Sequence, residues 1–164
     1  MIRLRRGTEQ DVSDIASLLI RSWQAHYQIF LPESLLSTMK VEKQVRRHRR
    51  YLKQGIHYFI AEKEHQLIGF ASLGPNRSAA LSAEYELYTL YVDAAFHHKG
   101  IGANLVRLVE TLVPAGHKLG VWVMEPNPFR SFYEQQGFEA AGKEIMDLGE
   151  TNVVNIGYVK TVSG

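Results

Sequence analysis

Residues 87–105 read LYTLYVDAAFHHKGIGANL. The first six positions hold only aromatic, β-branched and leucine residues, which is typical of a β-strand. After a short loop, Gly100 and Gly102 open an apolar helix, so backbone N–H groups converge at the positive end of the helix dipole. Glycine lets an anion approach the main chain, and Lys99 adds charge at the rim. The stretch predicts a strand, a loop and a helix, and the loop is either a phosphate site or an ordinary helix start with glycine for close packing.

Hydrophobic periodicity extends this unit in both directions. Before it we expect a strand at 2–6, helices near 9–23, 33–39 and 41–53, a hairpin of strands at 57–62 and 66–73, and a strand at 83–92. After it we expect a helix at 100–113, a strand at 119–124, a helix at 128–136 and strands near 138–147 and 152–161. Three successive strands predict an antiparallel meander, and the strand, helix, strand unit over 84–124 predicts a parallel right-handed crossover. The fold class is therefore α/β with a mixed sheet.

Composition fits one globular domain spanning residues 1–164, with 45% apolar and 22% charged residues. The absence of cysteine excludes disulfide scaffolds, thiolate zinc sites and cysteine nucleophiles. No run approaches the roughly 18 apolar residues of a membrane span, and the N-terminal stretch lacks the apolar segment of a signal peptide. We therefore expect a cytoplasmic protein without a membrane partner.

Charge is unevenly distributed along the chain. The total is +2, from 19 Lys and Arg against 17 Asp and Glu. Positions 40–53 hold seven of these bases and one acid, which gives +6 for this segment and −4 for the remainder. A solvated helix face explains the segment, and long-range steering of anionic acceptors or of cofactor phosphates is the alternative. Nucleic acid is not expected as a partner, because no series of aromatic residues accompanies the charges.

Two common phosphate motifs and a metal site do not fit. A dinucleotide fingerprint requires a third glycine where Leu105 stands. Residues 137–144 come within one residue of a Walker A loop, but Glu144 replaces the Ser or Thr that would hold magnesium. His97 and His98 lack the ligand spacing of a zinc site, so no metal is expected.

At residues 97–102 the chain resembles the GNAT superfamily of acyl-CoA-dependent N-acetyltransferases, whose loop reads Gln/Arg-x-x-Gly-x-Gly/Ala. A second family block, Asn-x-x-Ala-x-x-x-Tyr or close variants followed by Gly-Phe, has its counterpart at residues 127–138. The resemblance covers about residues 1–160. It implies a GNAT-like fold, in which a central, mostly antiparallel sheet with one parallel strand pair is flanked by helices. His97 departs from the usual Gln or Arg, and Arg130 departs from the usual Ala.

The resemblance also implies acetyl-CoA as cosubstrate, without a metal. The pyrophosphate would lie on the loop, and the main chain of the preceding strand would pair with the pantetheine arm, while the side chains of that strand are expected to be core. Asn127 would hold the pantetheine, with capping of the following helix as the alternative. The implied cofactor-binding residues are Leu90, Tyr91, Val92, His97, His98, Lys99, Gly100, Ile101, Gly102, Ala103, Asn127, Phe132 and Tyr133.

In this family the amine attacks the thioester directly in a ternary complex. Tyr133 corresponds to the general acid, since a phenol of pKa near 10 keeps its proton at pH 7 and can give it to the leaving thiolate. A carboxylate or an ordered water must take the proton of the amine. Glu86 is the candidate base or amine anchor and Glu84 is the reserve, because both alternate with Tyr88 on one strand face. The alternative is that these acids only keep that face soluble.

Aromatic residues at the end of the first helix are the candidate acceptor site. Trp23 and Tyr27, with Glu86 and Tyr88, could hold an alkylammonium group by cation–π contact and charge, although core packing explains Trp23 equally well. The expected partner is a small-molecule amine or a peptide amine, and the oligomeric state stays open, with a homodimer as one possibility. A noncatalytic acyl-CoA-binding module is the second hypothesis, motivated by His97 and Arg130.

Overall fold

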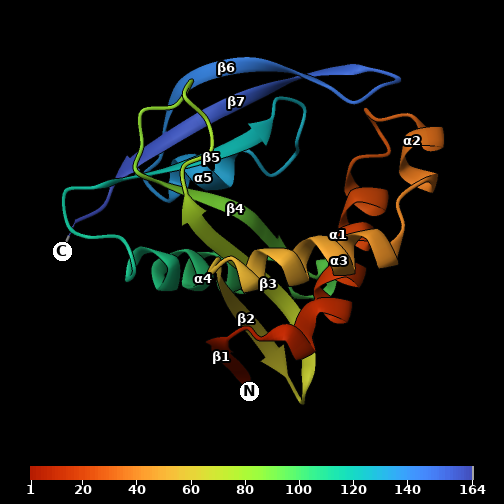
Figure 1. The fold of residues 1–164 in the computed structure, drawn as a ribbon, viewed down its shortest axis with the longest axis horizontal. Coiled ribbons are helices and arrows are strands. Elements are labelled where there is room, and N and C mark those ends of the chain that lie inside the picture. Colours follow the sequence, from red (N-terminus) through yellow and green to blue (C-terminus); the bar gives the residue numbers. More distant parts are fainter. Residues whose placement is uncertain (164) are drawn as a thin grey trace.

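The computed structural model describes residues 1–163 (Figure 1). Its strands are β1 (Ile2–Arg6), β2 (His57–Lys63), β3 (Gln66–Pro75), β4 (Tyr85–Val92), β5 (Lys118–Met124), β6 (Glu139–Asp147) and β7 (Asn152–Thr161). Its helices are α1 (Val12–His26), α2 (Glu33–Ser37), α3 (Val41–Lys53), α4 (Ile101–Glu110) and α5 (Ser131–Gln135), with 3₁₀ turns η1 (Glu9–Asp11) and η2 (Ala94–Phe96).

All seven strands form one sheet in the order β1-β2-β3-β4-β5-β7-β6. Only β4 and β5 pair in parallel, and every other neighbouring pair is antiparallel. Figure 1 shows the meander β1–β4 in the lower half and β5–β7 in the upper half. The expected mixed α/β sheet with one parallel pair is confirmed.

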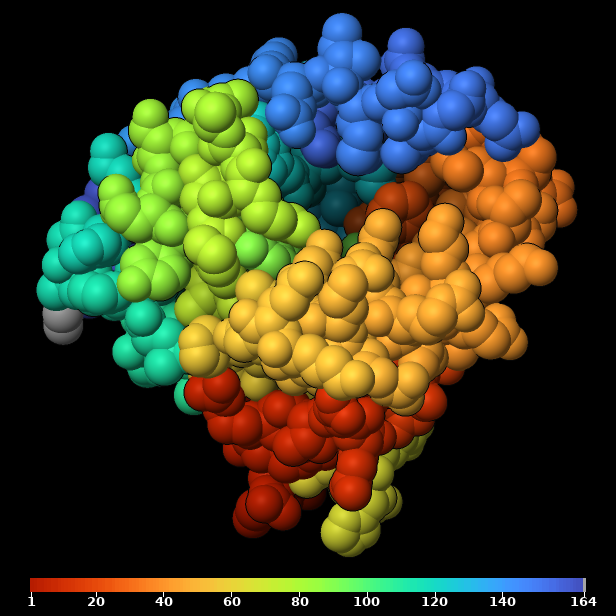
Figure 2. All heavy atoms as spheres, viewed as in Figure 1, coloured from red at the N-terminus to blue at the C-terminus, as the bar shows by residue number. Residues whose placement is uncertain are grey.

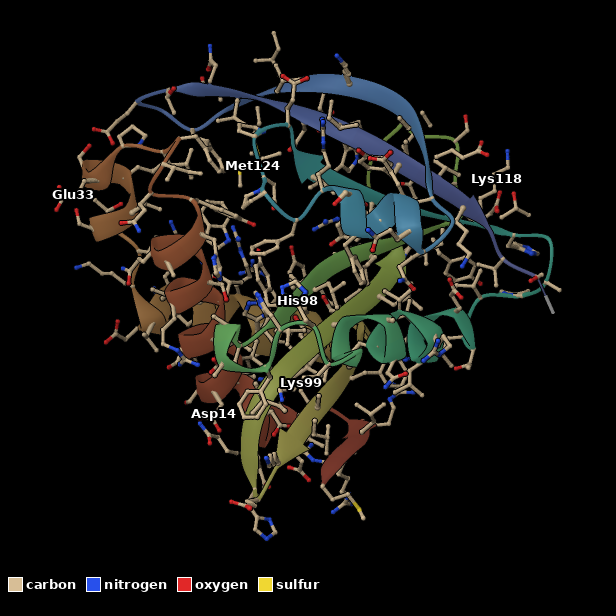
Figure 3. The ribbon with its side chains drawn as sticks, turned by 180° about the vertical axis from the view of Figure 1, so that it is seen from behind. Asp14, Glu33, His98, Lys99, Lys118 and Met124 are labelled. Atoms are coloured by element: carbon tan, nitrogen blue, oxygen red, sulfur yellow. The ribbon has the colours of Figure 1, made fainter. Side chains whose placement is uncertain are left out.

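Helices cover both faces of the meander. On one face α1 and α3 pack over residues such as Tyr58 and Phe70. On the other face α4 packs with Leu105 and Val109 against β2, β3 and β4. Figure 3, seen from behind, has α4 in front of the sheet. The loop that precedes α4 therefore opens on the opposite face from α3.

Several boundaries differ from those expected, for local reasons. Residues 9–11 form a 3₁₀ turn before α1, closed by a capping box in which Thr8 N donates to Asp11 Oδ2 at 2.8 Å. The α4 helix ends at Glu110 because residues 111–113 continue with tighter i→i−3 bonds. The α5 helix starts only at Ser131, because Asn127 Oδ1 accepts a bond from Phe129 N and holds a turn there.

The start of β4 is set by the loop before it. Asn76 Nδ2 donates to the carbonyls of Ser78, Leu81 and Ala83 at 2.8–3.0 Å. One amide thus folds residues 76–83 into a compact loop, and the strand begins at Tyr85 instead of residue 83. This loop carries Arg77, whose contacts matter below.

A bulge and a divergence shape the centre of the sheet. Ser72 pairs with Thr89 and Leu73 pairs with Leu87, so Tyr88 is an extra residue in β4. Parallel pairing of β4 with β5 is confined to Tyr85–Leu119 and Glu86–Gly120. Beyond these pairs the strands separate, and a cleft opens between them. Within residues 1–163 the helices are too short or too polar to cross a membrane.

Candidate functional site

The cleft between β4 and β5 has a volume of about 870 Å³. Its walls come from α1, β4, the loop into α4, β5 and α5, with Met146 and Asn155 closing one end. Figure 3 shows His98 and Lys99 on the loop before α4, below Met124 at the end of β5. Strands far apart in the sequence thus meet at one cavity because the sheet divides there.

The loop before α4 has the geometry that an anion site requires. Gly100 is the N-cap of α4 with φ +79°, and no other heavy atom lies within 4 Å of the position that a Cβ would take. Asn104 N donates to Gly100 O at 3.0 Å, so the helix begins directly after this glycine and its first N–H groups have no helical acceptor. At Gly102 a Cβ would lie 3.3 Å from the Phe132 ring. Phe132 therefore packs directly against the loop.

His97 lines the cleft but is directed at the strand. Its Nε2 lies 2.8 Å from Val92 O at the end of β4. Its ring stacks on His26 at 5.6 Å, and both rings contact Phe129 edge-on. Burial, and then the charge of His97, lower the pKa of His26. The Nε2 atom of His97 is occupied here by a main-chain carbonyl rather than directed into the glycine loop.

Tyr133 lies on α5 with its ring between Phe138 and Tyr158, and it lines the cleft. Burial, with a smaller effect of nearby Tyr91, raises the pKa of Tyr133 above its usual value. The phenol therefore keeps its proton throughout the physiological range. A protonated hydroxyl in this cavity can act as a proton donor.

Aromatic hydroxyls connect α1, β4 and the start of α5. Trp23 Nε1 donates to the Tyr91 hydroxyl at 2.9 Å, and Asn127 Nδ2 donates to the Tyr27 hydroxyl at 3.2 Å. Burial is the main cause that raises the pKa of Tyr27, with Tyr91 and Tyr133 adding to it. The expected residues Trp23, Tyr27 and Asn127 are thus brought together.

Tyr91 was expected to contribute only its backbone, but its side chain lines the cleft. The bulge at Tyr88 explains this, because it places Tyr88 and Tyr91 together on the α1 face while Leu90 and Val92 pack on the α4 face. Strict alternation would have grouped Tyr88 with Leu90. The sequence contains no local signal for the extra residue.

The carboxylates expected to act on the amine lie outside the cleft. Glu86 is 3% exposed, and its carboxylate accepts bonds from Arg77 N at 2.9 Å and Arg77 Nη2 at 2.7 Å. Glu84, just before β4, accepts a bond from Lys118 N at the start of β5 at 2.7 Å. Within residues 1–163 the cleft lining contains no Asp, Glu, Lys or Arg, so Lys99 and Arg130 are outside it as well.

Arg77 ties this carboxylate to two aromatic residues. Its guanidinium lies 3.6 Å from the centre of the Tyr88 ring, and its Nη1 donates to the Tyr51 hydroxyl at 3.2 Å. Tyr88 lines the cleft and donates to Pro75 O at 2.6 Å. The Glu86–Arg77 pair thus lies outside the cleft and contacts its wall through Tyr88.

Many lining residues were not anticipated from the sequence, among them His26, Trp122, Phe129, Met146 and Asn155. They come from separate elements, and only the tertiary arrangement brings them together. Trp122 Nε1 is buried without a hydrogen-bond partner among residues 1–163. Such unpaired buried donors are uncommon, and this one belongs to a residue that lines the cleft.

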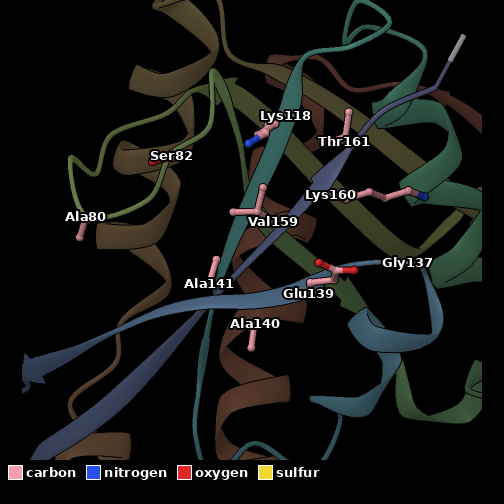
Figure 4. A pocket seen from close by; sticks show the side chains of 10 residues that line it. All are labelled: Ala80, Ser82, Lys118, Gly137, Glu139, Ala140, Ala141, Val159, Lys160 and Thr161. Atoms are coloured by element: carbon pink, nitrogen blue, oxygen red, sulfur yellow. The ribbon is translucent and has the colours of Figure 1, made fainter.

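A second groove of about 530 Å³ runs along β5, β7 and the start of β6, below the 76–84 loop (Figure 4). Its Lys160 is already paired with Glu110 at 2.8 Å. The other lining side chains that Figure 4 shows are small, except for Lys118, Glu139 and Val159. We therefore assign the functional site to the cleft between β4 and β5.

Comparison with known families agrees with this geometry. Residues 54–140 match the model of the acetyltransferase (GNAT) domain. The chain belongs to the GNAT acetyltransferase family. The matched segment runs from the end of α3 to the start of β6 and so includes the bulged strand, the glycine loop and Tyr133. The resemblance noted in the sequence is confirmed.

Individual relatives support the same assignment. This GNAT chain is similar to the uncharacterized N-acetyltransferase YuaI of Bacillus subtilis, with 29% identity over 160 residues that cover 91% of each chain. Its fold resembles the paiA N-acetyltransferase of Thermoplasma acidophilum in complex with coenzyme A, with TM-score 0.71, 18% identity and 98% and 99% of the two chains covered. It also resembles the ribosomal-protein-alanine N-acetyltransferase of Brucella melitensis, with TM-score 0.72, 21% identity and 97% and 99% covered. Among residues 1–163 no cluster of three or more metal-binding side chains occurs.

Proposed function

We propose that this GNAT protein transfers the acetyl group of acetyl-CoA to a primary amine by direct attack in a ternary complex. The observation that carries the proposal is the opening between β4 and β5, which joins the glycine loop to the partly buried Tyr133 in one cavity. The family assignment supplies the acetyl transfer. The cavity supplies a place where the two substrates can meet.

The cosubstrate fits the cleft in two parts. The N–H groups after Gly100 would bind the pyrophosphate, since a helix N-terminus attracts phosphate. The edge of β4 from Leu90 to Val92 has no strand partner on the β5 side, and it would pair with the amide groups of the pantetheine arm. The similar paiA protein was solved in complex with coenzyme A.

The transfer then needs a group that protonates the leaving sulfur and a group that accepts the proton of the amine. The amine nitrogen attacks the thioester carbonyl carbon, a C–N bond forms, and the C–S bond breaks. Tyr133 would give its proton to the sulfur as the C–S bond breaks. Burial raises the pKa of Tyr133 above its usual value near 10, so the phenol keeps its proton until that moment. A fully formed thiolate, whose thiol has a pKa near 8.5, would be the weaker base, so the proton transfer must accompany bond breaking. Solvent would return a proton to Tyr133.

An ordered water, rather than Glu86, would take the proton of the amine. Glu86 is engaged by Arg77 and lies outside the cleft, and no other carboxylate lines the cleft within residues 1–163. Glu86 would instead have a structural role, because its ion pair holds Arg77 against the Tyr88 ring. The proposal thus retains Tyr133 as the acid and reassigns Glu86.

Thiol release from acetyl-CoA in the presence of an amine panel tests the proposal. We expect turnover by the wild type and a kcat lower by about 100-fold or more in Tyr133→Phe, because a general acid contributes at least this factor. The Phe132→Leu variant, which changes a neighbour without a hydroxyl, serves as the control and should lose much less of kcat. Acetyl-CoA binding without turnover of any amine would favour the noncatalytic module instead.

A further inference from the structure

The bases of α3 and its N-cap form a charged surface that the proposed chemistry does not use. All seven are exposed, and none forms an ion pair with a carboxylate within residues 1–163. They are Lys40, Lys43, Arg46, Arg47, Arg49, Arg50 and Lys53. Seven unpaired cations on a short segment create a local field that favours an anionic ligand.

This helix borders the acceptor side of the cleft. Figure 2 shows a hollow between α3, the 76–84 loop and the β6–β7 hairpin, with β5 at its floor. Tyr51 of α3 lies 5.8 Å, between ring centres, from Tyr88, which lines the cleft. The glycine loop opens on the opposite face of the sheet, beside α4. The α3 cations are therefore placed to meet the acceptor rather than the phosphates of acetyl-CoA.

Helical spacing places two of the cations toward the side of α3 that carries Tyr51. Arg47 precedes Tyr51 by four residues and Lys43 precedes it by eight, and such positions stack along one helix face. Tyr51 reaches the cleft wall through its contacts with Tyr88 and Arg77. Arg49, two residues before Tyr51, points to the other side of the helix. The chain thus offers an inward pair, Lys43 and Arg47, and an outward control on one helix.

The lining of the cleft is compatible with an anionic group on the acceptor. Within residues 1–163 this lining contains no carboxylate that would attract a purely cationic amine. The buried Glu86 would repel an anion, but the guanidinium of Arg77 offsets its charge at 2.7 Å. The cleft itself therefore gives no electrostatic preference for a cationic acceptor over an anionic one.

The rim of the hollow that lies across from α3 carries a net negative charge. Residues 139–151 of the β6–β7 hairpin carry four acids and one base. Figure 2 shows this hairpin across the hollow from α3. An acceptor with an anionic group is therefore repelled from one rim and attracted to the other, which fixes its orientation.

We propose that the acceptor is an amine that also carries a carboxylate or phosphate group, and that this anionic group lies against Lys43 and Arg47. The inference rests on the proposed function, because it concerns the second substrate of the same cleft. It excludes alkylamines and polyamines without an anionic group as preferred acceptors. The shared chemistry is an anion with oxygen acceptors, and the carboxylate and phosphate sources are separated by the test.

Matched acceptor pairs test this proposal by thiol release from acetyl-CoA at low salt. The pairs are β-alanine with β-alaninamide, phosphoethanolamine with ethanolamine, and an Asp-Ala dipeptide amide with its Asn-Ala counterpart. We expect kcat/KM to be about tenfold or more higher for the anionic member of at least one pair, since a charge-assisted contact is worth about 1.5–3 kcal/mol. The pair with the largest ratio identifies the anion. Spermidine should be a poor acceptor.

Two variants assign the preference to the helix. In Lys43→Gln/Arg47→Gln the anionic member should lose about tenfold in kcat/KM while the neutral member changes little. In the control, Arg49→Gln, the ratio between members should stay as in the wild type, and acetyl-CoA should raise the melting temperature equally in all three proteins. Higher salt should reduce the preference in the wild type.

Three results would overturn the inference. They are equal turnover of both members in every pair, a preference for neutral or cationic amines, and a preference that survives in Lys43→Gln/Arg47→Gln. In each case the proposed acetyl transfer would stand, because some amine is still acetylated. A failure to acetylate any amine would contradict both proposals. Binding of a single-stranded oligonucleotide that depends on Lys43 and Arg47, without any acceptor preference, would make the surface a nucleic-acid site.

Discussion

The role assigned to Glu86 changes once its neighbours in the structure are known. In the sequence it is an acid on an aromatic strand, and such a charge is costly unless it faces a cleft or a partner. Arg77, nine residues earlier in a loop, is that partner, and its backbone and side chain both bind the carboxylate. The ion pair could not be read from spacing, since it depends on how Asn76 folds the loop.

Substituting Arg77 should lower the stability of the protein, whereas substituting Glu86 should leave kcat nearly unchanged. Arg77→Gln leaves Glu86 buried without its cation and should lower the free energy of unfolding by about 2 kcal/mol, below the full cost of breaking a buried pair because Arg77 is half exposed. Glu86→Gln should keep kcat within a few-fold, since the carboxylate is not the base. Urea unfolding and thiol release measure both. A folded Glu86→Gln protein without activity would restore Glu86 as the catalytic base.

Tyr91 is a second residue whose role came only from the structure. Tyr91→Phe removes the acceptor of Trp23 Nε1 and leaves a donor without its partner in the cleft wall. We expect a loss of about 1–2 kcal/mol in the free energy of unfolding, the usual cost of an unsatisfied buried donor. Double substitution with Trp23→Phe, which removes the orphaned N–H as well, should cost less than the sum of the single changes. Strict additivity would show that this hydrogen bond contributes nothing.

At the scale of elements, α3 is anchored to the sheet by a buried imidazole. His48 is 1% exposed, and its Nδ1 lies 2.6 Å from the Tyr58 hydroxyl. Burial, and then the charge of Arg47, lower the pKa of His48 to about 4. An otherwise basic, exposed helix is thus attached through a residue that must stay neutral.

This anchor should make stability depend on pH. In the unfolded chain His48 binds a proton near pH 6.5, but in the folded chain only near 4, so stability is complete above 6.5 and declines as the pH falls to 4. The loss should reach about 3 kcal/mol for this group. Urea unfolding at pH 7 and pH 4.5 measures it, and His48→Gln should remove most of the difference. An equal decline in both proteins would assign it to other groups.

The start of α4 offers an element-level test of the cofactor loop. Gly100 and Gly116 both have positive φ, +79° and +87°, with open space where a Cβ would lie. Alanine at either position should cost about 1 kcal/mol of stability from backbone strain. Only Gly100→Ala should also weaken acetyl-CoA binding, measured by calorimetry, because Gly116 lies beyond the other end of the helix. Equal affinities in both variants would place the pyrophosphate elsewhere.

For the whole molecule, periodicity and capping residues predicted the order of elements well. The helix at 41–53 and the final strand at 152–161 were expected at the bounds observed. Gly55, with φ +88°, follows the helix, and Gly149, with φ +90°, lies in the turn before the strand. The glycine loop, Tyr133, Trp23 and Tyr27 were expected and do line one cleft. Local signals determine these features, so a sequence can reveal them.

What the sequence did not reveal depends on contacts between distant segments. The bulge at Tyr88 is a mismatch between two strands, and it decided that the Tyr91 side chain lines the cleft. Met146 and Asn155 reach the site because β7 inserts next to β5, which places the last hairpin over the cavity. No window of consecutive residues contains this information.

The separation of β4 from β5 has a consequence for turnover. The contacts proposed for acetyl-CoA lie along the β4 edge and the glycine loop, and the released coenzyme A retains the same pantetheine and pyrophosphate groups. Contacts that bind acetyl-CoA and coenzyme A equally well do not promote the release of coenzyme A. We expect coenzyme A to inhibit competitively against acetyl-CoA, with an inhibition constant within about tenfold of the dissociation constant of acetyl-CoA, a gap of 1.4 kcal/mol. Initial rates with added coenzyme A measure it. If acetyl-CoA fills the gap between β4 and β5, coenzyme A must leave that gap before each new turnover, and the strand edge that binds the cosubstrate would also retain the product.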